Sequence, residues 1–231
     1  MQSAQRSLSP HEGVAAAIAS ECDRLEVAVD PDVQAQIATF FSELARWSQR
    51  IRLTGNRNAE TLVREHFADA LIAATQLPLM QLPTGGARCL DVGAGGGLPG
   101  MVIALLDRSI DLTLVEANGK KCAFLRHIAH RLRRRVKVVE ARIEAYASGA
   151  TDDAFVPYDI AWSRAAFAPD DWIAMGSDLI APSGILFVFA TDRALITNPD
   201  RTMTGHTYTS GRDAPRQLIV VGDRPSNEEN G

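Results

Sequence analysis

One glycine-rich segment, residues 91–100, constrains the fold of this chain more than any other feature. It reads Asp-Val-Gly-Ala-Gly-Gly-Gly-Leu-Pro-Gly, with an apolar run at 87–92 leading in and another at 98–106 leading out. Glycines allow a turn with positive φ and let a ligand approach the backbone. Pro99 suits the first turn of a helix, where its missing N–H costs nothing. The segment therefore predicts a strand, a glycine turn and a helix, the arrangement of a nucleotide-type cofactor site.

Two classes of cofactor fit this turn. A dinucleotide site needs G-x-G-x-x-G with an acid about 20 residues further on, and Glu116 follows the next apolar run at such a distance. The D-x-G-x-G-x-G turn typical of S-adenosylmethionine sites fits better, and its members are Asp91, Gly93, Gly95 and Gly97. S-adenosylmethionine has no pyrophosphate for a helix N-terminus to hold, but its ammonium and ribose diol need acceptors, which Asp91 and Glu116 can provide. We therefore expect a methyltransferase, with an NAD-dependent oxidoreductase as the alternative.

Composition indicates a soluble globular protein with one domain of ordinary size, or a main domain with an appendage. The 231 residues are 46% hydrophobic and 23% charged. No apolar stretch reaches the roughly 18 residues of a membrane span, and the start of the sequence lacks a signal-peptide core. The odd number and the spacing of Cys22, Cys89 and Cys122 favour reduced thiols over metal ligands. We therefore expect a cytoplasmic monomer without metal.

Positive charge is concentrated in one part of the chain. Residues 120–142 hold nine Lys or Arg and a single acid, Glu140, in a chain whose net charge is −4. A basic segment on an otherwise acidic protein favours a localised phosphate-binding face, because each neutralised phosphate releases counterions. The alternative is an ordinary solvated helix face.

The first 83 residues have the pattern of a helical segment. Asp30 and Pro31 form a helix start. Apolar residues at helical spacing predict helices over 14–25, 31–49 and 60–76. A cluster of proline and glycine then ends the helical part, so we place a domain boundary between residues 83 and 84.

Residues 84–223 alternate between strand and helix patterns. Strands are predicted at 88–92, 111–115, 136–140, 158–163 and 184–190. Helices are predicted at 98–106, 119–134 and 169–180. Such alternation predicts an α/β fold with a mainly parallel sheet, helices on both faces and ligands at the carboxyl ends of the strands. Two last strands, at 207–209 and 217–221, are predicted to form an antiparallel hairpin at the sheet edge, and 224–231 a disordered tail.

Six short stretches between residues 40 and 190 follow one another in the order found in a bacterial family. They are Leu44–Thr54, His66–Leu71, the glycine turn with its Leu-Pro-Gly ending, Lys120–Leu125, Arg142-Ile143-Glu144 and Ser163-Arg164-Ala165. The family patterns are Trp-Asn-x-x-x-Asn-Leu-Thr, His-x-x-Asp-Ser-Leu, the same glycine turn, Lys-Arg-x-x-Phe-Leu, Arg-x-Glu and Ser-Arg-Ala. The chain therefore resembles the 16S rRNA guanine-N7 methyltransferases of the RsmG or GidB family.

The resemblance implies a Rossmann-like fold of the S-adenosylmethionine-dependent methyltransferases. The cofactor residues, those of the resemblance together with the turn and acceptor residues named above, are Asp91, Gly93, Gly95, Gly97, Leu98, Glu116, Ala117, Asn118, Ile143, Glu144 and Arg164. Among them, Glu116 with its two following neighbours would hold the ribose and adenosine side, while Ile143 and Glu144 would bracket the adenine. Arg164 is the implied catalytic residue, facing the methyl donor and the target base from the end of the fourth strand.

The implied reaction explains why the sequence shows no His–Asp or paired-carboxylate arrangement. Neutral guanine carries a lone pair on N7, so methyl transfer needs positioning rather than proton removal. We expect Arg164 to anchor a phosphate rather than guanine O6. The implied partner is 16S rRNA or the small ribosomal subunit, and the candidate RNA-binding residues are Arg52, Lys120, Lys121, Arg131 and Arg134. Trp47, on the apolar stripe of its helix, is expected in the core rather than as a stacking platform.

Two differences from the family concern the substrate side. Ser48 and Arg52 stand where the family pattern has asparagines, and the predicted fifth strand is followed by Asp192 rather than by Lys-Gly. These differences leave open a methyltransferase for another RNA or for a small molecule. A non-catalytic RNA-binding protein that keeps S-adenosylmethionine for stability is the alternative outside the enzymes.

Overall fold

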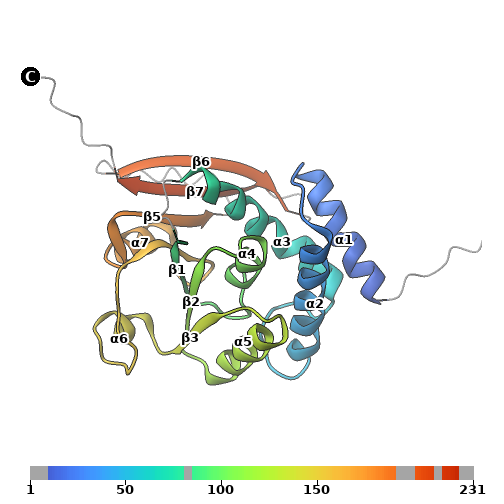
Figure 1. The fold of residues 1–231 in the computed structure, drawn as a ribbon, viewed down its shortest axis with the longest axis horizontal. Coiled ribbons are helices and arrows are strands. Elements are labelled where there is room, and N and C mark those ends of the chain that lie inside the picture. Colours follow the sequence, from blue (N-terminus) through green and yellow to red (C-terminus); the bar gives the residue numbers. More distant parts are fainter. Residues whose placement is uncertain (1–9, 81–84, 191–200, 211–214, 224–231) are drawn as a thin grey trace, which may run out of the picture.

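The structure is a computed structural model of the chain and describes residues 10–80, 85–190, 201–210 and 215–223. Figure 1 shows the described part as a central sheet with helices on both sides. Three predictions lie outside these ranges. They are the tail at 224–231, the boundary between residues 83 and 84, and the position of Asp192.

Within the described ranges, seven strands form one sheet. They are β1 (Arg88–Val92), β2 (Asp111–Glu116), β3 (Val136–Glu140), β4 (Tyr158–Ser163), β5 (Ile180–Ala190), β6 (Arg201–Thr209) and β7 (Pro215–Asp223). Their order is β3-β2-β1-β4-β5-β7-β6. Neighbours among β1 to β5 are parallel, whereas β7 is antiparallel to both β5 and β6. The predicted sheet, mostly parallel with an antiparallel last part, is confirmed.

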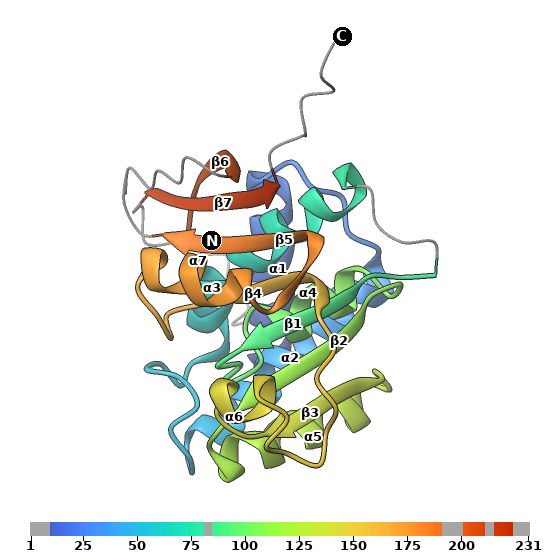
Figure 2. The ribbon, with the colours of Figure 1, turned by 90° about the vertical axis from the view of Figure 1, so that its left-hand side faces the viewer.

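Helices cover both faces of this sheet. They are α1 (Pro10–Arg24), α2 (Pro31–Ser48), α3 (Ala59–Gln76), α4 (Gly100–Leu106), α5 (Gly119–Arg131), α6 (Ile143–Ala147) and α7 (Pro169–Ser177), with a short 3₁₀ helix, η1 (Leu77–Leu79). Helices α1 to α5 lie on one face, and α6 and α7 lie on the other (Figure 2). The helical segment predicted at the start of the chain therefore forms part of one helical layer.

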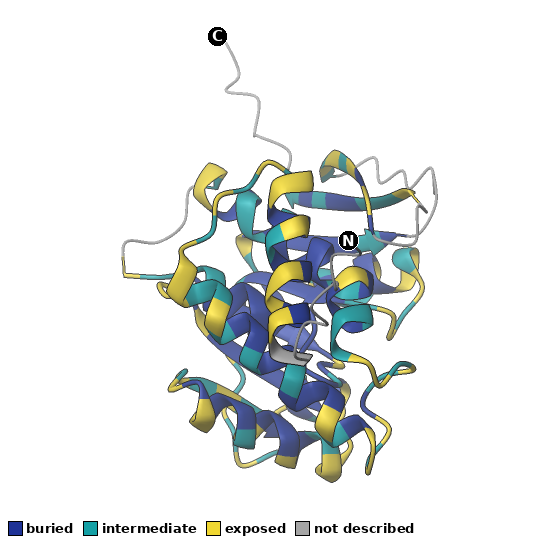
Figure 3. Ribbon diagram, turned by 90° about the vertical axis from the view of Figure 1, so that its right-hand side faces the viewer, coloured by how far each residue is buried: buried dark blue, intermediate teal, exposed yellow. Residues whose placement is uncertain are grey.

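Alternation along the strands gives each face of the sheet its own core, because successive side chains point to opposite faces. In β1, Cys89 packs with the layer of α1 to α5, while Leu90 packs with α6 and α7. In β2, Leu114 likewise packs with the layer of α1 to α5, and Val115 packs with α6 and α7. The helices turn their buried sides to the sheet and their exposed sides outward, as Figure 3 shows.

Helix α5 ends three residues earlier than the predicted helix 119–134. Arg133 adopts a positive φ of 50°, and the N–H of Arg134 donates to the Ala129 carbonyl at 2.9 Å. This is the left-handed closure that commonly ends a helix, formed here without glycine. The basic residues after Arg131 therefore leave the helix and lie on the loop that leads to β3.

Other boundaries also differ from the predictions. Strand β5 begins at Ile180 instead of residue 184, because the Pro-Ser-Gly stretch within it forms an irregularity rather than a turn. Tyr158 pairs with Ile180 and Ile160 pairs with Ile185, so extra residues bulge out on β5. Strand β6 begins at 201 rather than 207, α4 at 100 rather than 98, and α7 ends at 177 rather than 180. Helix α6 was not predicted as a helix.

The structure adds three observations on the described residues. None of their helices combines the length and the apolar character that crossing a membrane requires. Their His, Cys, Asp and Glu side chains form no group of three or more that could hold a metal ion. Cys22, Cys89 and Cys122 are buried free thiols.

Candidate cofactor and substrate site

The glycine turn joins the end of β1 to the start of α4 at the carboxyl edge of the sheet. Gly93, Gly95 and Gly97 have positive φ values of 71°, 56° and 79°, which glycine adopts without a steric cost. The N–H groups of Gly93 and Ala94 donate to the Val115 carbonyl of β2 at 2.9 and 3.1 Å. The turn is therefore fixed against the neighbouring strand.

Asp91 lies beneath the turn rather than on its surface. The residue is 1% exposed, and its Oδ2 accepts a hydrogen bond of 3.0 Å from the N–H of Gly100. A Cβ at Gly100 would collide with that carboxylate, so glycine is required there. Burial raises the pKa of Asp91 to about 7, although the Trp162 indole, the Gly100 N–H and the charge of Arg164 all favour the ionised form. Asp91 thus fixes the start of α4 below the turn.

Glu116 ends β2 with its carboxylate at the turn. Its Oε2 accepts from the N–H of Gly95 at 2.9 Å, and its Oε1 accepts from the N–H of Asn118 at 2.8 Å. The side chain of Asn118 in turn caps α5 by accepting from the N–H groups of Lys120 and Lys121. Each carboxylate oxygen has two lone pairs, so acceptor capacity for a diol remains.

The other expected cofactor residues follow β1, β2 and β3 at the same edge. Ala117 and Glu144 are exposed, whereas Leu98 and Ile143 are buried. The side chain of Ile143, in α6, packs in the core between the sheet and the layer of α6 and α7. As the first residue of α6, its N–H has no acceptor within the helix, so its backbone rather than its side chain is available to a ligand.

A second group of polar side chains meets around Asp69 of α3. Asp69 is 1% exposed, and its Oδ2 lies 2.5 Å from Nε of Arg164 and 2.6 Å from Nη1 of Arg216. Its Oδ1 accepts from the Tyr208 hydroxyl at 2.7 Å. Burial and the adjacent carboxylate raise the pKa of Tyr208, so its hydroxyl remains a donor. This Asp69 cluster joins α3 to the end of β4, to β6 and to β7.

His66 holds Arg164 from a second direction. It precedes Asp69 by three residues on α3, so both side chains lie on one face of the helix. Its Nδ1 is 2.8 Å from Nη2 of Arg164. Because a guanidinium only donates, Nδ1 is the acceptor and the ring is neutral. The His-x-x-Asp and Ser-Arg-Ala stretches that carried the resemblance therefore meet in space.

A cavity of about 360 Å³ opens beside the Asp69 cluster. It is lined by Asp69, Arg164, Ala165, Phe167, Pro169, Phe189, Ala190, Tyr208 and Arg216. Its volume lies in the usual range of ligand pockets. Its lining combines aromatic side chains with guanidiniums, the groups that recognise an unstacked base and its phosphate.

The cavity adjoins the glycine turn. A Cβ built on Gly93 would lie 2.9 Å from Cβ of Ala166, two residues after Arg164. The hydroxyl of Ser163, the last residue of β4, donates to the Val92 carbonyl at 2.9 Å. A ligand in the cavity and a cofactor at the turn would therefore share one edge of the sheet.

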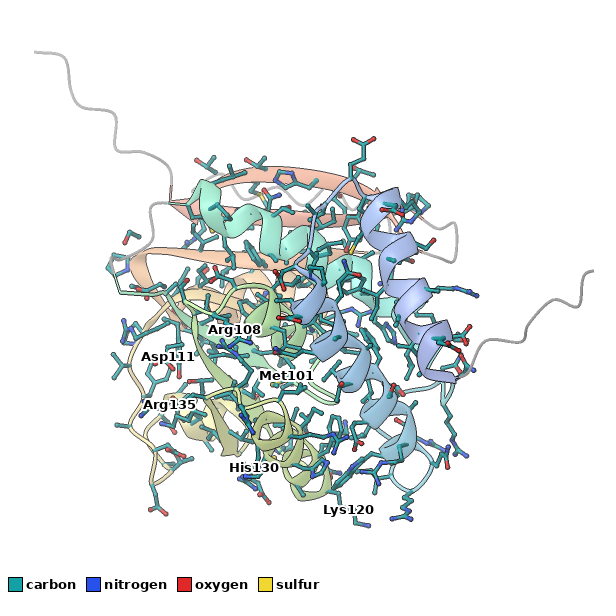
Figure 4. The ribbon with its side chains drawn as sticks, turned by 45° about the vertical axis from the view of Figure 1, so that its right-hand side comes forward. Met101, Arg108, Asp111, Lys120, His130 and Arg135 are labelled. Atoms are coloured by element: carbon teal, nitrogen blue, oxygen red, sulfur yellow. The ribbon has the colours of Figure 1, made fainter. Side chains whose placement is uncertain are left out.

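The basic residues expected to face RNA lie along α5 and the neighbouring loops. Figure 4 labels Lys120 at the start of α5, His130 near its end and Arg135 on the following loop. All three are exposed, as is Arg52 between α2 and α3. The exposed charges of Lys120, Arg135 and Arg52 therefore extend from the cofactor edge along one side of the molecule.

Of the other three residues expected to bind RNA, two lie near glutamates and one is partly buried. Lys121 Nζ is 3.9 Å from Glu116, and Arg131 Nε is 3.6 Å from Glu43. Arg134 is partly buried, and this burial lowers its pKa. Arg134 is thus less accessible to a phosphate than the exposed Arg131.

Tyr208 and Arg216 are site residues that sequence reasoning missed. Both lie in strands whose pattern is weak, and nothing near either residue points to Asp69. Ser48, which departs from the family pattern, has a structural contact, since its buried hydroxyl lies 3.1 Å from the Thr54 hydroxyl across the loop after α2.

Comparison with known proteins identifies relatives across most of the chain. Residues 33–203 match the family model GidB, described as rRNA small subunit methyltransferase G. A ribosomal RNA small subunit methyltransferase G of Halorhodospira halophila is 35% identical over 176 residues, covering 75% of this chain and 77% of that protein. A protein of the same name in Myxococcus xanthus is 30% identical over 209 residues, covering 90% and 87%.

Solved structures agree on the fold. An O-methyltransferase from Bacillus cereus matches 91% of this chain and 100% of its own with a TM-score of 0.59 and 14% identity. The O-methyltransferase TomG from Streptomyces achromogenes matches 89% and 96% with a TM-score of 0.56 and 13% identity. The predicted Rossmann-like methyltransferase fold and the predicted family are confirmed. The chain belongs to the rRNA small subunit methyltransferase G family.

Proposed function

We propose that the protein transfers the methyl group of S-adenosylmethionine to N7 of a guanine in the 16S rRNA of the small ribosomal subunit. The observation that carries this proposal is the cavity of about 360 Å³ beside Arg164, which adjoins the glycine turn. The printed names of the relatives support the substrate. A ribosomal substrate implies action in the cytoplasm.

The residues at the turn fit the cofactor. Gly93 is exposed on the turn, so a ligand can approach its backbone, and Glu116 retains acceptor positions for the ribose diol. Gly93 would approach the methionine part, and the N–H of Ile143 with the carboxylate of Glu144 would flank the adenine. The bound cofactor supplies an electrophilic methyl group on a sulfonium.

Asp69 is not placed to act as a base. Three donors, from Arg164, Arg216 and Tyr208, already occupy its two oxygens. Guanine N7 has a lone pair in its neutral form and needs no proton removed. The contribution of the cavity is therefore to hold the base in line with the methyl group and to exclude water.

Arg164 and Arg216 are better suited to a phosphate than to the base. Methylation places a positive charge on the guanine ring, which a neighbouring guanidinium would disfavour. A phosphate gains from both guanidiniums, each of which has N–H donors beyond those bound to Asp69. Phe167 and Phe189 of the cavity wall would stack on the base.

The test is methyl transfer from labelled S-adenosylmethionine to small ribosomal subunits from a strain that lacks the family enzyme. We expect label at one guanine N7. Arg164→Ala should lower kcat/KM for the subunit about a hundredfold, roughly 2.7 kcal/mol, and change cofactor affinity much less. The exposed Arg64→Ala, on the outer side of α3, is the control and should change neither.

Other outcomes would refute parts of the proposal. Cofactor binding without label in any subunit RNA would exclude this substrate and favour another RNA, a small molecule or a non-catalytic role. A change confined to cofactor affinity in Arg164→Ala would exclude contact between Arg164 and RNA.

A further inference from the structure

A second hollow, with no lining residue in common with the first, lies at the end of α2. It has a volume of about 200 Å³ and is lined by Arg46, Trp47, Arg50 and Ile51. Arg46 and Arg50 are exposed. Trp47 is only partly buried, although its position on the apolar stripe of α2 predicted a place in the core. An indole ring and two exposed arginines thus border one surface hollow.

Helix α5 holds the ring of Trp47 in place. The ring centroid lies 5.5 Å from that of Phe124 and 5.1 Å from that of His127. These contacts lie toward α5, and the same residue also lines the hollow. A ring already fixed by packing loses little conformational entropy when a ligand covers it.

A buried carboxylate organises the cations around this ring. Glu43 lies 2.5 Å from Nη2 of Arg46, 3.3 Å from Nε2 of His127 and 3.6 Å from Nε of Arg131. Burial alone would raise the pKa of Glu43, but hydrogen bonds from Arg46 and His127 outweigh it and lower the pKa. Glu43 therefore stays ionised. Two arginines contact this one carboxylate and Arg50 adds a third guanidinium, so the rim remains positive.

The hollow adjoins the cofactor edge. A Cβ on Gly96 would lie 2.9 Å from Cδ1 of Leu44 and 3.7 Å from Cβ of Leu53. These two leucines precede and follow residues 46–51, so the same stretch of chain packs on the glycine turn and forms the hollow. A nucleic acid strand at the turn would meet this surface next.

We infer that an unpaired base of the RNA substrate stacks on Trp47, with its phosphate between Arg46 and Arg50. The inference rests on the proposed function, because it takes the substrate to be RNA. Single-stranded nucleic acid is commonly held by aromatic rings beside positive charge, and every base offers a face for such stacking. The Trp47 site would hold a nucleotide near the target without reading its identity.

Tryptophan fluorescence tests this site directly. The chain has three tryptophans, and Trp162 and Trp172 are only 0% and 1% exposed, so RNA can cover Trp47 alone. The probes are an adenine oligoribonucleotide of about eight residues and an abasic oligonucleotide of equal length. We expect the first to quench the emission and to protect it from acrylamide. Equal quenching by both, or quenching by neither at saturation, would overturn the inference.

Substitutions separate stacking from charge. Trp47→Leu should weaken oligonucleotide binding roughly tenfold, whereas Trp47→Phe, which keeps an aromatic face, should lose much less. Arg46→Ala should weaken binding and reduce the salt slope by about one. Arg64→Ala is its matched control, since both arginines are 59% exposed and each is paired with a glutamate on its own helix. Equal effects of the two arginine variants would overturn the inference, even if Trp47→Leu fails to fold.

These measurements need no methyl transfer, so the two proposals can fail separately. Quenching of Trp47 without label in 16S rRNA would refute the proposed substrate and leave the stacking site standing. Labelled guanine with unquenched Trp47 would refute the stacking site alone.

Discussion

The cofactor turn and the Asp69 cluster lie at the same edge of one sheet but are assembled from different distances along the chain. The turn is held by contacts such as Glu116 with Gly95, 21 residues apart. Asp69 meets Tyr208 and Arg216 across 139 and 147 residues. The cofactor side therefore depends largely on contacts that are nearer along the chain, whereas the substrate side exists only when the last strands dock on α3.

The Asp69→Ala variant is expected to cause the largest loss of stability. It tests whether the long-range contacts of the Asp69 cluster hold β6 and β7 on α3. It leaves Arg164, Arg216 and Tyr208 around a space without their shared acceptor. Removing one partner of a buried ion pair costs about 3–5 kcal/mol of unfolding free energy. Urea unfolding measures the loss, and hydrogen exchange in β6 and β7 should rise together with it.

A matched surface substitution controls for the loss of a carboxylate on the same helix. Glu60→Ala removes a partly exposed partner that lies 4.0 Å from Arg64, and its effect should stay within about 0.5 kcal/mol. A loss below about 1 kcal/mol in Asp69→Ala would mean that the final strands dock without the cluster.

The Asp91→Asn variant tests the cofactor side, through the dependence of its unfolding free energy on pH. Burial raises the pKa of Asp91 to about 7 from an ordinary value of 3.8. Between these values the folded protein binds more protons than the unfolded chain, so Asp91 makes stability fall as pH rises through 7. Asparagine does not titrate. The unfolding free energy of the wild type relative to the variant should therefore drop by about 2–3 kcal/mol between pH 5 and pH 8, in urea titrations without cofactor.

The sign of this change in relative unfolding free energy shows whether burial or the partners of Asp91 control its ionisation. Curves that run parallel for the two proteins would show that Asp91 is ionised throughout and that the start of α4 compensates fully for its burial. A wild type that gains stability with pH would show that Arg164 and the Gly100 N–H outweigh burial.

The same contrast decides what the sequence could predict. Asp91, the glycines and Glu116 lie close together in the sequence, and their spacing alone indicated strand, turn and helix. The His66 and Asp69 stretch was noticed only through resemblance, and its contact with Arg164 depends on how α3 packs on the rest of the fold, including α4 and β7. Tyr208 and Arg216 had no local signal, because contacts between a helix and strands far along the chain leave no periodic pattern.

Two of the predicted element boundaries, those of β5 and α5, were wrong for a related reason. A proline and a glycine within β5 predict a break, but the strand accommodates them as a bulge opposite Tyr158 and Ile160. Arg133 ends α5 in a conformation that sequence reasoning assigns to glycine. In β5 the pairing with β4 overrides the local preference of the residues, whereas at Arg133 the local closure of the helix does so.

The smallest expected effect comes from Glu116→Gln, which tests whether the cofactor side acts through a single acceptor group. The amide keeps one carbonyl oxygen for the N–H groups of Gly95 and Asn118, and turns its NH₂ toward one of them. Affinity for S-adenosylmethionine, measured by calorimetry, should fall about tenfold, or roughly 1.4 kcal/mol. Glu140→Gln at the end of β3, exposed and paired with Arg126 at 3.1 Å, is the matched control and should bind as the wild type does. A higher KM for RNA with unchanged cofactor affinity would contradict this role and would show that Glu116 acts on the substrate instead.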